Sequence, residues 1–196
     1  MLRYHFIALS LLSVAISTIV MAGSPHRSDY AGQERRIIKS LSIDDIQQLQ
    51  AGKGWGLAKA AELNGVPGPA HVLQMKDKIS LTKEQEIKIQ ALFEDMKLKA
   101  VPLGVELIEM EKRLNDSFAN GVMTNELLNQ QLDSISEVYK KLRYVHLATH
   151  LMTPKVLTPQ QIQKYNRLRG YHSGDPCQNI PEGHNMAMWK KHNGCD

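Results

Sequence analysis

Signals for β-structure are missing from this 196-residue sequence. No run of apolar and polar residues alternates over the length of a strand, and no Asn-Gly turn joins two apolar strands. Apolar residues instead recur every three or four positions over most of the chain, which is the period of an α-helix. We therefore predict an all-α fold.

The common motifs of catalysis are also missing. There is no Gly-x-Ser-x-Gly nucleophile turn, no phosphate-binding loop, and no pair of carboxylates that stands out from the charged helix faces. Lys and Arg exceed Asp and Glu only by 24 to 20, without a long basic run or aromatics interleaved with basic residues. We expect neither an enzyme nor a nucleic-acid-binding protein.

The N-terminus has the pattern of an export signal. Arg3 precedes an apolar run from Phe6 to about Ala22 that ends in small residues. Serines and a threonine interrupt the run, which argues against a permanent membrane anchor. No cysteine follows the run, so lipidation is not indicated. We predict a signal peptide at residues 1–22, cleaved near Ala22, and a periplasmic mature protein.

Cysteine is scarce, since only Cys177 and Cys195 are present, both near the C-terminus. An even cysteine count in an exported chain favours a disulfide, and a loop this short adds about 3 kcal/mol in the chain-entropy model. Thiolate ligands of a soft metal are the alternative, and they exclude the disulfide. The tail holds further soft or imidazole donors: His172, His184, Met186, Met188 and His192.

Four segments have the pattern of a helix start, in which an apolar residue precedes a capping Ser or Thr. These segments are 41–45, 81–85, 123–127 and 157–161. In the second and fourth, Gln85 and Gln161 stand where a side chain can return a hydrogen bond to the cap and complete a capping box. Each of these helices is therefore specified locally.

Two long helices are predicted, from residue 82 to about 120 and from about 124 to 151. Gly121 is placed to end the first, and Pro154 stops the second. Since only three residues join them, they must fold back as an antiparallel hairpin. Shorter helices are predicted at 42–50, 55–64 and 158–169.

The chain is predicted to have one helical domain. Residues 51–71 are expected to form a turn, a short helix and another turn. The polar segments beside the domain are expected to be poorly ordered outside the disulfide loop. The predicted organisation is a signal peptide at 1–22, a flexible segment at 23–41, the helical domain at 42–170 and a disulfide-containing tail at 171–196.

A pair of histidines, His146 and His150, lies one helical turn apart, so that both imidazoles can reach one metal ion. A zinc-protease helix needs Glu after the first His, and Leu147 stands there. Folding the hairpin about its tip sets Met96 opposite the pair, and His71 is a possible fourth ligand. Imidazole and thioether ligands suit zinc, nickel, cobalt or copper. The alternative is that His146 continues the apolar stripe while His150 faces solvent.

The apolar stripe of the hairpin is longer than the short helices can cover. We therefore predict an antiparallel homodimer. The same surface, with Met96 and Met110, could instead bind unfolded client proteins. A hairpin core or dimer interface is the simpler interpretation of these residues.

The paired Leu-Thr-x-x-Gln boxes at 81–85 and 157–161 flank the hairpin behind an export signal. This pattern resembles the LTXXQ-motif family of periplasmic proteins typified by Spy and CpxP, over roughly residues 40 to 170. The architecture is also similar to that of CnrX-type heavy-metal sensors. The resemblance implies a helical, often dimeric, cradle-shaped protein that acts in envelope stress. The His pair of the sensors precedes the hairpin, where this chain has only His71, so their metal site does not transfer.

Three functions remain open from the sequence. The leading hypothesis is a periplasmic sensor or buffer that binds a transition metal ion in envelope or heavy-metal stress. The alternative is an ATP-independent chaperone for unfolded proteins, and the third is pH sensing through histidines near an apolar face. Expected partners are a second copy, unfolded clients or a membrane-bound sensor or regulator.

Overall fold

The computed structural model describes residues 28–171, 177, 180 and 183–195. Within these ranges every regular element is a helix, and no helix is long and apolar enough to cross a membrane. The predicted signal peptide lies outside the described residues. The chain divides into two compact units, Met1–Glu34 and Arg35–Asp196. The second unit carries the fold and the site, while only residues 28–34 of the first are described, including the start of the short 3₁₀-helix η1 (Gln33–Arg35).

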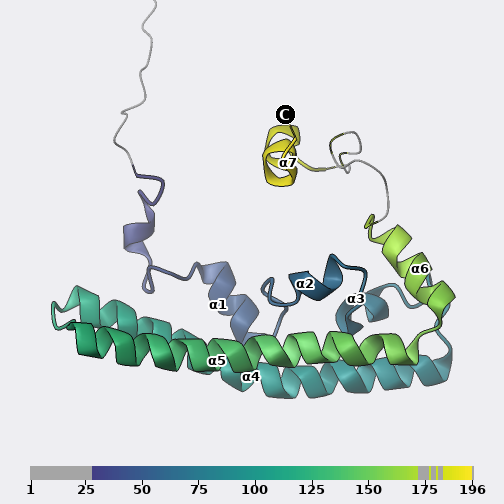
Figure 1. Cartoon of the computed structure of the whole chain (residues 1–196), viewed down its shortest axis with the longest axis horizontal. Helices are drawn as coiled ribbons and strands as arrows, with labels where there is room; N and C mark the ends of the chain where they lie inside the picture. Colours follow the sequence, from purple (N-terminus) through teal and green to yellow (C-terminus); the bar gives the residue numbers. More distant parts are fainter. Residues whose placement is uncertain (1–27, 172–176, 178–179, 181–182, 196) are drawn as a thin grey trace, which may run out of the picture. The chain divides into compact units, whose positions relative to one another are not determined.

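Two long helices, α4 (Lys83–Ala119) and α5 (Asn125–Met152), pack side by side as an antiparallel hairpin (Figure 1). Thr82 and Thr124 cap their N-termini through side-chain hydrogen bonds, and Gly121 has a positive φ of 66° at the turn. The predicted all-α class, with a long hairpin and shorter helices, is confirmed. The cradle-like dimer stays a prediction.

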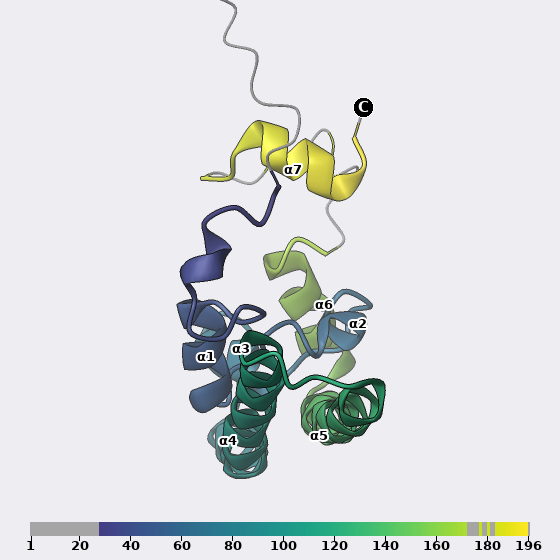
Figure 2. The ribbon, with the colours of Figure 1, turned by 90° about the vertical axis from the view of Figure 1, so that its left-hand side faces the viewer.

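Four short helices lie on one side of the hairpin: α1 (Ile43–Gln50), α2 (Lys59–Glu62), α3 (Pro69–Gln74) and α6 (Pro159–Leu168). Seen end on, α1 and α3 lie over α4, while α2 and α6 lie over α5 (Figure 2). A 3₁₀-helix, η2 (Thr153–Val156), joins α5 to α6. The short helices therefore cover one face of the hairpin.

The structure corrects several sequence predictions. The helix predicted at 55–64 is only the four residues of α2, and α3 extends beyond the turn predicted for 51–71. The segment 23–41 ends in two core residues, Ile38 and Leu41, because these apolar side chains pack against the hairpin. The disulfide loop, for which no poor order was predicted, contains a further helix, α7 (Met186–Asn193).

The two Leu-Thr-x-x-Gln boxes contact each other. Gln85 and Gln161 each complete a capping box at their own helix start, as predicted; α1 has a third box, through Ser42 and Asp45. The side-chain amides of the two glutamines also exchange hydrogen bonds of 2.9 Å. Further bonds join Gln85 to the Val156 carbonyl and Gln161 to the Ser80 carbonyl. The boxes therefore cap two helices and tie the start of α4 to the start of α6.

The buried apolar residues form two clusters along the hairpin. The larger joins α1 to the middle of the hairpin and contains Ile38, Leu41, Leu49, Leu57, Ala100, Leu107, Ile108, Val138 and Leu142. The smaller joins α3 and α6 to the start of α4 and contains Val72, Ile79, Ile89, Leu157 and Tyr165. Met96 and His146 are buried at intermediate positions along their helices and belong to neither cluster. Along the chain, each of these two residues lies between positions that contribute to the larger cluster and positions that contribute to the smaller one.

Candidate functional site

A pocket of about 430 Å³ lies beside Met96 and His146. It is lined by residues of α2, α3, α4 and α5 and by the chain after α6. All four predicted metal ligands line it, and they come from three helices: His71 from α3, Met96 from α4, and His146 and His150 from α5. The fold therefore brings together side chains that lie far apart in the sequence.

His146 is 3% exposed, and its Nε2 atom is buried without a hydrogen-bond partner. Burial, together with the charge of His150, lowers the pKa of His146 from 6.5 to about 4. The ring is therefore neutral at pH 7, which is the form that binds a metal ion. In the neutral ring one nitrogen has a lone pair to offer.

His150 is also buried, so the alternative that it faces solvent is wrong. Its Nδ1 atom lies 2.8 Å from the Val66 carbonyl oxygen. Because a carbonyl can only accept, Nδ1 donates this bond, and in the neutral form of the ring Nε2 would carry the lone pair. Metal-bound histidines are commonly oriented by such a bond from their second nitrogen.

The His150 ring occupies the space that a side chain at position 68 would need, and Gly68 has no side chain. A Cβ atom built on Gly68 would lie 2.4 Å from Nε2 of His150, closer than real Cβ contacts come. Glycine at this position lets the imidazole enter the pocket wall next to α3. Any larger residue would displace the ring.

Glu62 is the carboxylate of the pocket, and no motif or spacing in the sequence pointed to it. Its side chain at the end of α2 is buried. All hydrogen bonds to the carboxylate are accepted by the Oε1 atom. The donors to Oε1 are the Tyr165 hydroxyl, the Tyr171 hydroxyl at 2.8 Å, Arg169 Nε at 3.2 Å and His71 Nδ1 at 3.2 Å. The other oxygen, Oε2, is buried without a hydrogen bond, 3.9 Å from Nδ1 of His150.

The protonation of Glu62 follows from these contacts. Burial by itself would raise its pKa, but hydrogen bonds from His71, Tyr165 and Tyr171 and the charge of His71 outweigh burial. They lower the pKa from 4.5 to about 2. Glu62 is therefore ionised at pH 7, paired with Arg169 through Oε1, while its Oε2 atom accepts no hydrogen bond.

The four predicted ligands do not play equal parts. Met96, His146 and His150 are buried side chains of the hairpin, whereas the His71 side chain is 39% exposed and is bonded to Glu62. No group of three or more His, Cys, Asp or Glu side chains in the described part of the chain could hold a metal ion as it stands. The donor types fit a borderline transition metal ion, and side-chain rotation within the pocket would have to complete the ligand set.

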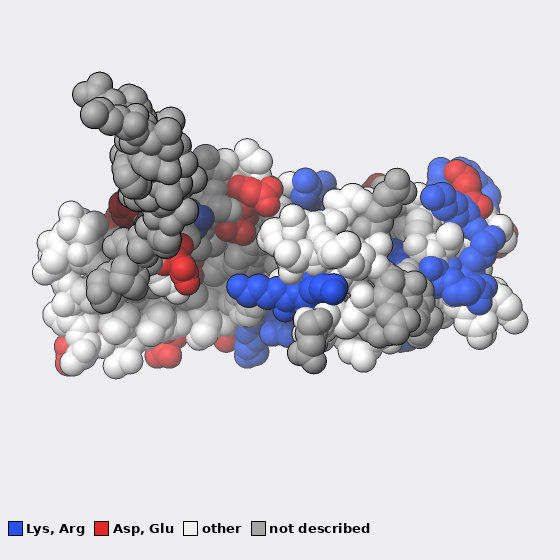
Figure 3. Space-filling model, turned by 90° about the horizontal axis from the view of Figure 1, so that it is seen from above, with Lys and Arg blue, Asp and Glu red and all other residues white. Residues whose placement is uncertain are grey.

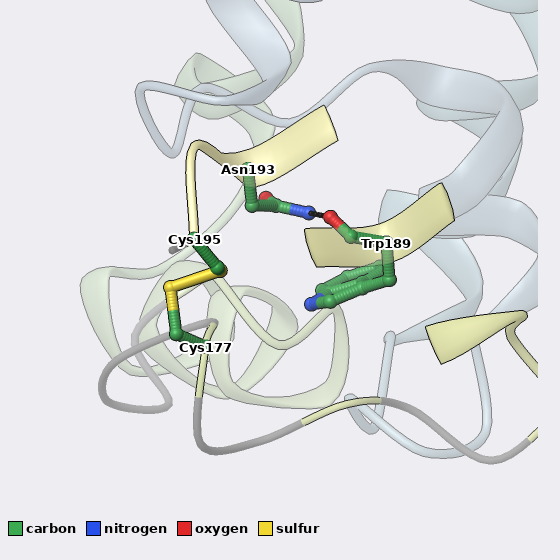
Figure 4. The surroundings of a disulfide bond; sticks show 4 residues. All are labelled: Cys177, Trp189, Asn193 and Cys195. Carbon is green, nitrogen blue, oxygen red and sulfur yellow. Dashed lines mark hydrogen bonds between the residues drawn. A yellow bond between two sulfur atoms is a disulfide. The ribbon is translucent and has the colours of Figure 1, made fainter. Parts of the chain in front are cut away.

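The two cysteines of the tail form the predicted disulfide and are not the thiolate metal ligands of the alternative interpretation. Cys177 and Cys195 form a disulfide, with Cα atoms 5.5 Å apart (Figure 4). The Asn193 side chain donates to the Trp189 carbonyl oxygen at 2.8 Å. Both sulfurs are used in the disulfide, so they are not thiolate ligands.

The surface charge is mixed. Seen from above, Lys and Arg side chains form separate groups among uncharged residues, with Asp and Glu beside them (Figure 3). The residues described on this face do not form a continuous basic surface, which agrees with the near balance of 24 basic and 20 acidic residues.

The fold and the pocket define an all-α hairpin protein with a buried histidine and carboxylate site. Comparison with family models, with curated proteins and with solved structures found no match. The resemblance to the LTXXQ-motif family therefore rests on the paired boxes and on the order of the helices.

Proposed function

We propose that the protein binds a transition metal ion in the pocket between the two apolar clusters, as a sensor or buffer in envelope or heavy-metal stress. One observation carries the proposal: Glu62 Oε2 and His146 Nε2 are both buried without hydrogen-bond partners and line the same pocket. A buried polar atom without a partner costs about 1–3 kcal/mol. A cation bound between these atoms would recover that cost.

The ligands follow from the chemistry of the pocket. His146 and His150 would supply imidazole nitrogens, Glu62 a carboxylate oxygen and Met96 a thioether sulfur. The Val66 carbonyl oxygen already orients the His150 ring, because it accepts a hydrogen bond from Nδ1. This mixture of nitrogen, oxygen and sulfur suits nickel, cobalt, copper or zinc, whereas calcium and magnesium prefer oxygen ligands alone. The bound ion would give Glu62 Oε2 the partner that it lacks.

Addition of zinc, nickel, cobalt or copper is expected to raise the melting temperature of the metal-free protein at neutral pH. An ion at a hundred times its Kd stabilises the folded state by about 2.7 kcal/mol, because it binds only the folded chain. The double variant His146→Gln, His150→Gln should lose this shift, as measured by thermal unfolding with and without each metal.

The matched control changes two histidines of the tail, His184→Gln and His192→Gln. Both residues are exposed and neither lines the pocket, so this variant should keep the full metal-dependent shift. A wild-type protein without any metal-dependent shift would contradict the proposed function. An equal loss in the tail variant would move the metal site to the tail.

A chaperone is the second candidate function, and exposed apolar side chains on the hairpin favour it. Leu98 is 77% exposed, Tyr144 is 71% exposed and Leu151 is 67% exposed. Unfolded clients or a second copy of the chain would both cover such side chains. We keep the homodimer and the periplasmic location as parts of this proposal.

The chaperone function predicts that the purified protein suppresses the aggregation of an unfolding client, measured by light scattering. The double variant Tyr144→Ser, Leu151→Ser should suppress aggregation less than wild type, because it removes apolar contact area from the exposed face of α5. The variant His146→Gln, His150→Gln should suppress it as well as wild type. Absence of suppression by the wild type would refute this candidate.

A further inference from the structure

The chain returns to the pocket directly after α6. Arg169 is the C-cap of α6, and Gly170 follows with a positive φ of 77°. The amide of Tyr171 donates to the Asn166 carbonyl at 3.1 Å, and the amide of Gly170 donates to the Arg167 carbonyl at 3.1 Å. These two bonds make a Schellman turn, the usual way in which a glycine reverses the chain at a helix end. The turn directs Tyr171 back towards α2.

Both side chains of this turn bind Glu62 and each other. Arg169 Nε lies 3.2 Å from Glu62 Oε1, and the Tyr171 hydroxyl donates to the same oxygen at 2.8 Å. Arg169 Nη2 donates to the Tyr171 hydroxyl at 2.9 Å, and the guanidinium lies 5.5 Å from the centre of the Tyr171 ring. The turn is therefore held to the body of the protein through one carboxylate.

Arg169 is the permanent positive charge at this carboxylate. His71 also donates to Oε1, but an imidazole can lose its proton, whereas the guanidinium stays charged at every pH at which proteins are folded. The Arg169 side chain is 32% exposed, so it lies at the edge of the pocket and can swing outwards. The buried oxygen Oε2 is on the other side of the same carboxylate.

We propose that residues 169–171 form a latch that a cation bound in the pocket releases. The inference rests on the proposed function, because the cation is the metal ion held by Glu62 Oε2. Glu62 has a single negative charge, which Arg169 already offsets. A divalent ion at Oε2 takes over that charge and repels the guanidinium, so the bonds from Arg169 and Tyr171 to Oε1 weaken. Occupancy of the pocket is thereby converted into a change at the end of α6.

Coupling between the ion and the latch must be reciprocal. If the ion weakens the hold of Arg169 on Glu62, then removal of the Arg169 charge must strengthen the binding of the ion by the same factor. Coupling of this kind is commonly fivefold or more in affinity. The two directions can be measured separately.

The first measurement is the affinity for Zn²⁺ and Ni²⁺ by isothermal titration calorimetry on the purified protein. Arg169→Gln should bind the ion at least about fivefold more tightly than wild type. The matched control is Arg167→Gln, which removes the same charge from an exposed position of α6 that does not line the pocket. Its affinity should stay within about twofold of wild type, since exposed charges are screened. Equal affinities of Arg169→Gln and wild type would overturn the latch and leave the metal site intact.

The second measurement is amide hydrogen exchange of the peptide that spans residues 166–171. Saturating Zn²⁺ should speed exchange at Arg169, Gly170 and Tyr171 by about fivefold or more. A second peptide, from the capped start of α6, should keep its exchange rate. Unchanged exchange at saturation would overturn the latch.

A third variant tests the latch without any metal. Glu62→Gln removes the charge that holds Arg169, so it should speed exchange at residues 169–171 in a metal-free buffer; Tyr171→Phe should do so more weakly, because it removes only one donor. If the wild type binds no metal, the proposed function fails and these two variants still decide whether Glu62 holds the turn. Wild-type exchange rates in both variants would refute that hold.

Discussion

Acidification of the metal-free protein from pH 7 to pH 4 is expected to lower its free energy of unfolding by about 3 kcal/mol through His146 alone. Burial, together with the charge of His150, holds the pKa of His146 at about 4, whereas the unfolded chain has the ordinary value of 6.5. As the pH falls below 6.5, the unfolded state takes up a proton that the folded state does not bind. Unfolding therefore becomes easier until the pH reaches the folded pKa.

Urea unfolding at several pH values between 7 and 4, with a chelator present, measures this effect. The variant His146→Gln should show a flatter dependence over this window, because glutamine does not titrate. His192→Gln, at an exposed tail position, should keep the wild-type dependence. An equally steep decline in His146→Gln would show that other groups cause it.

Glu62 is expected to produce a second window at lower pH. Burial alone would raise its pKa. Hydrogen bonds from His71, Tyr165 and Tyr171, together with the charge of His71, lower the pKa by more than burial raises it, so that it falls from 4.5 to about 2. The unfolded chain is protonated first as the pH falls below 4.5, so about 3 kcal/mol of stability is lost between pH 4.5 and pH 2. Glu62→Gln should be less stable than wild type at pH 7 and should lack this window. A variant as stable as wild type at pH 7 would mean that the network around Glu62 contributes nothing.

Replacement of Gly104 by alanine is expected to destabilise the protein by about 1–3 kcal/mol, the usual cost of overfilling a packed site. Gly104 lies inside α4 where α1 crosses it, and a Cβ atom there would lie 2.4 Å from the Leu49 carbonyl oxygen. That oxygen belongs to the backbone, so the two helices would have to separate, and Leu49 would leave the larger apolar cluster. Alanine favours a helix over glycine by about 1 kcal/mol, which offsets only part of this cost.

Thermal unfolding measures the Gly104 effect, with a fall of about 2–4 °C in melting temperature for each kcal/mol in a chain of this size. Gly54→Ala is the matched control, because a Cβ atom there meets nothing within 4 Å. Its stability should change by less than about 0.5 kcal/mol. A Gly104→Ala protein that melts with wild type would show that the α1 and α4 contact yields without cost.

The helices of the hairpin could be predicted closely because their signals are local. Thr82 and Gln85 act on amides within one turn of the helix start, and Gly121 ends α4 through its own φ. The predicted bounds of both long helices therefore differ from the observed ones by about one residue. Helix α3 escaped prediction because its six residues are too few for a period to be visible and because prolines and glycines precede it.

The histidine pair and Met96 could be placed together from the sequence because a hairpin relates positions on its two arms by simple counting. Glu62 could not be found this way. Its partners Tyr165 and Arg169 lie 103 and 107 residues further along the chain, and the carbonyl that orients His150 belongs to Val66, 84 residues before it.

Local capping and apolar periodicity thus determined where the helices begin and end, since these act over a few residues. Only the tertiary structure decided that His150 is buried, that Gly68 lies against its ring, and that Glu62 has one oxygen crowded with donors and one without a partner. Burial and polar atoms without hydrogen-bond partners arise where several helices pack together. The residues of these helices lie far apart in the sequence, so no local pattern predicts their contacts.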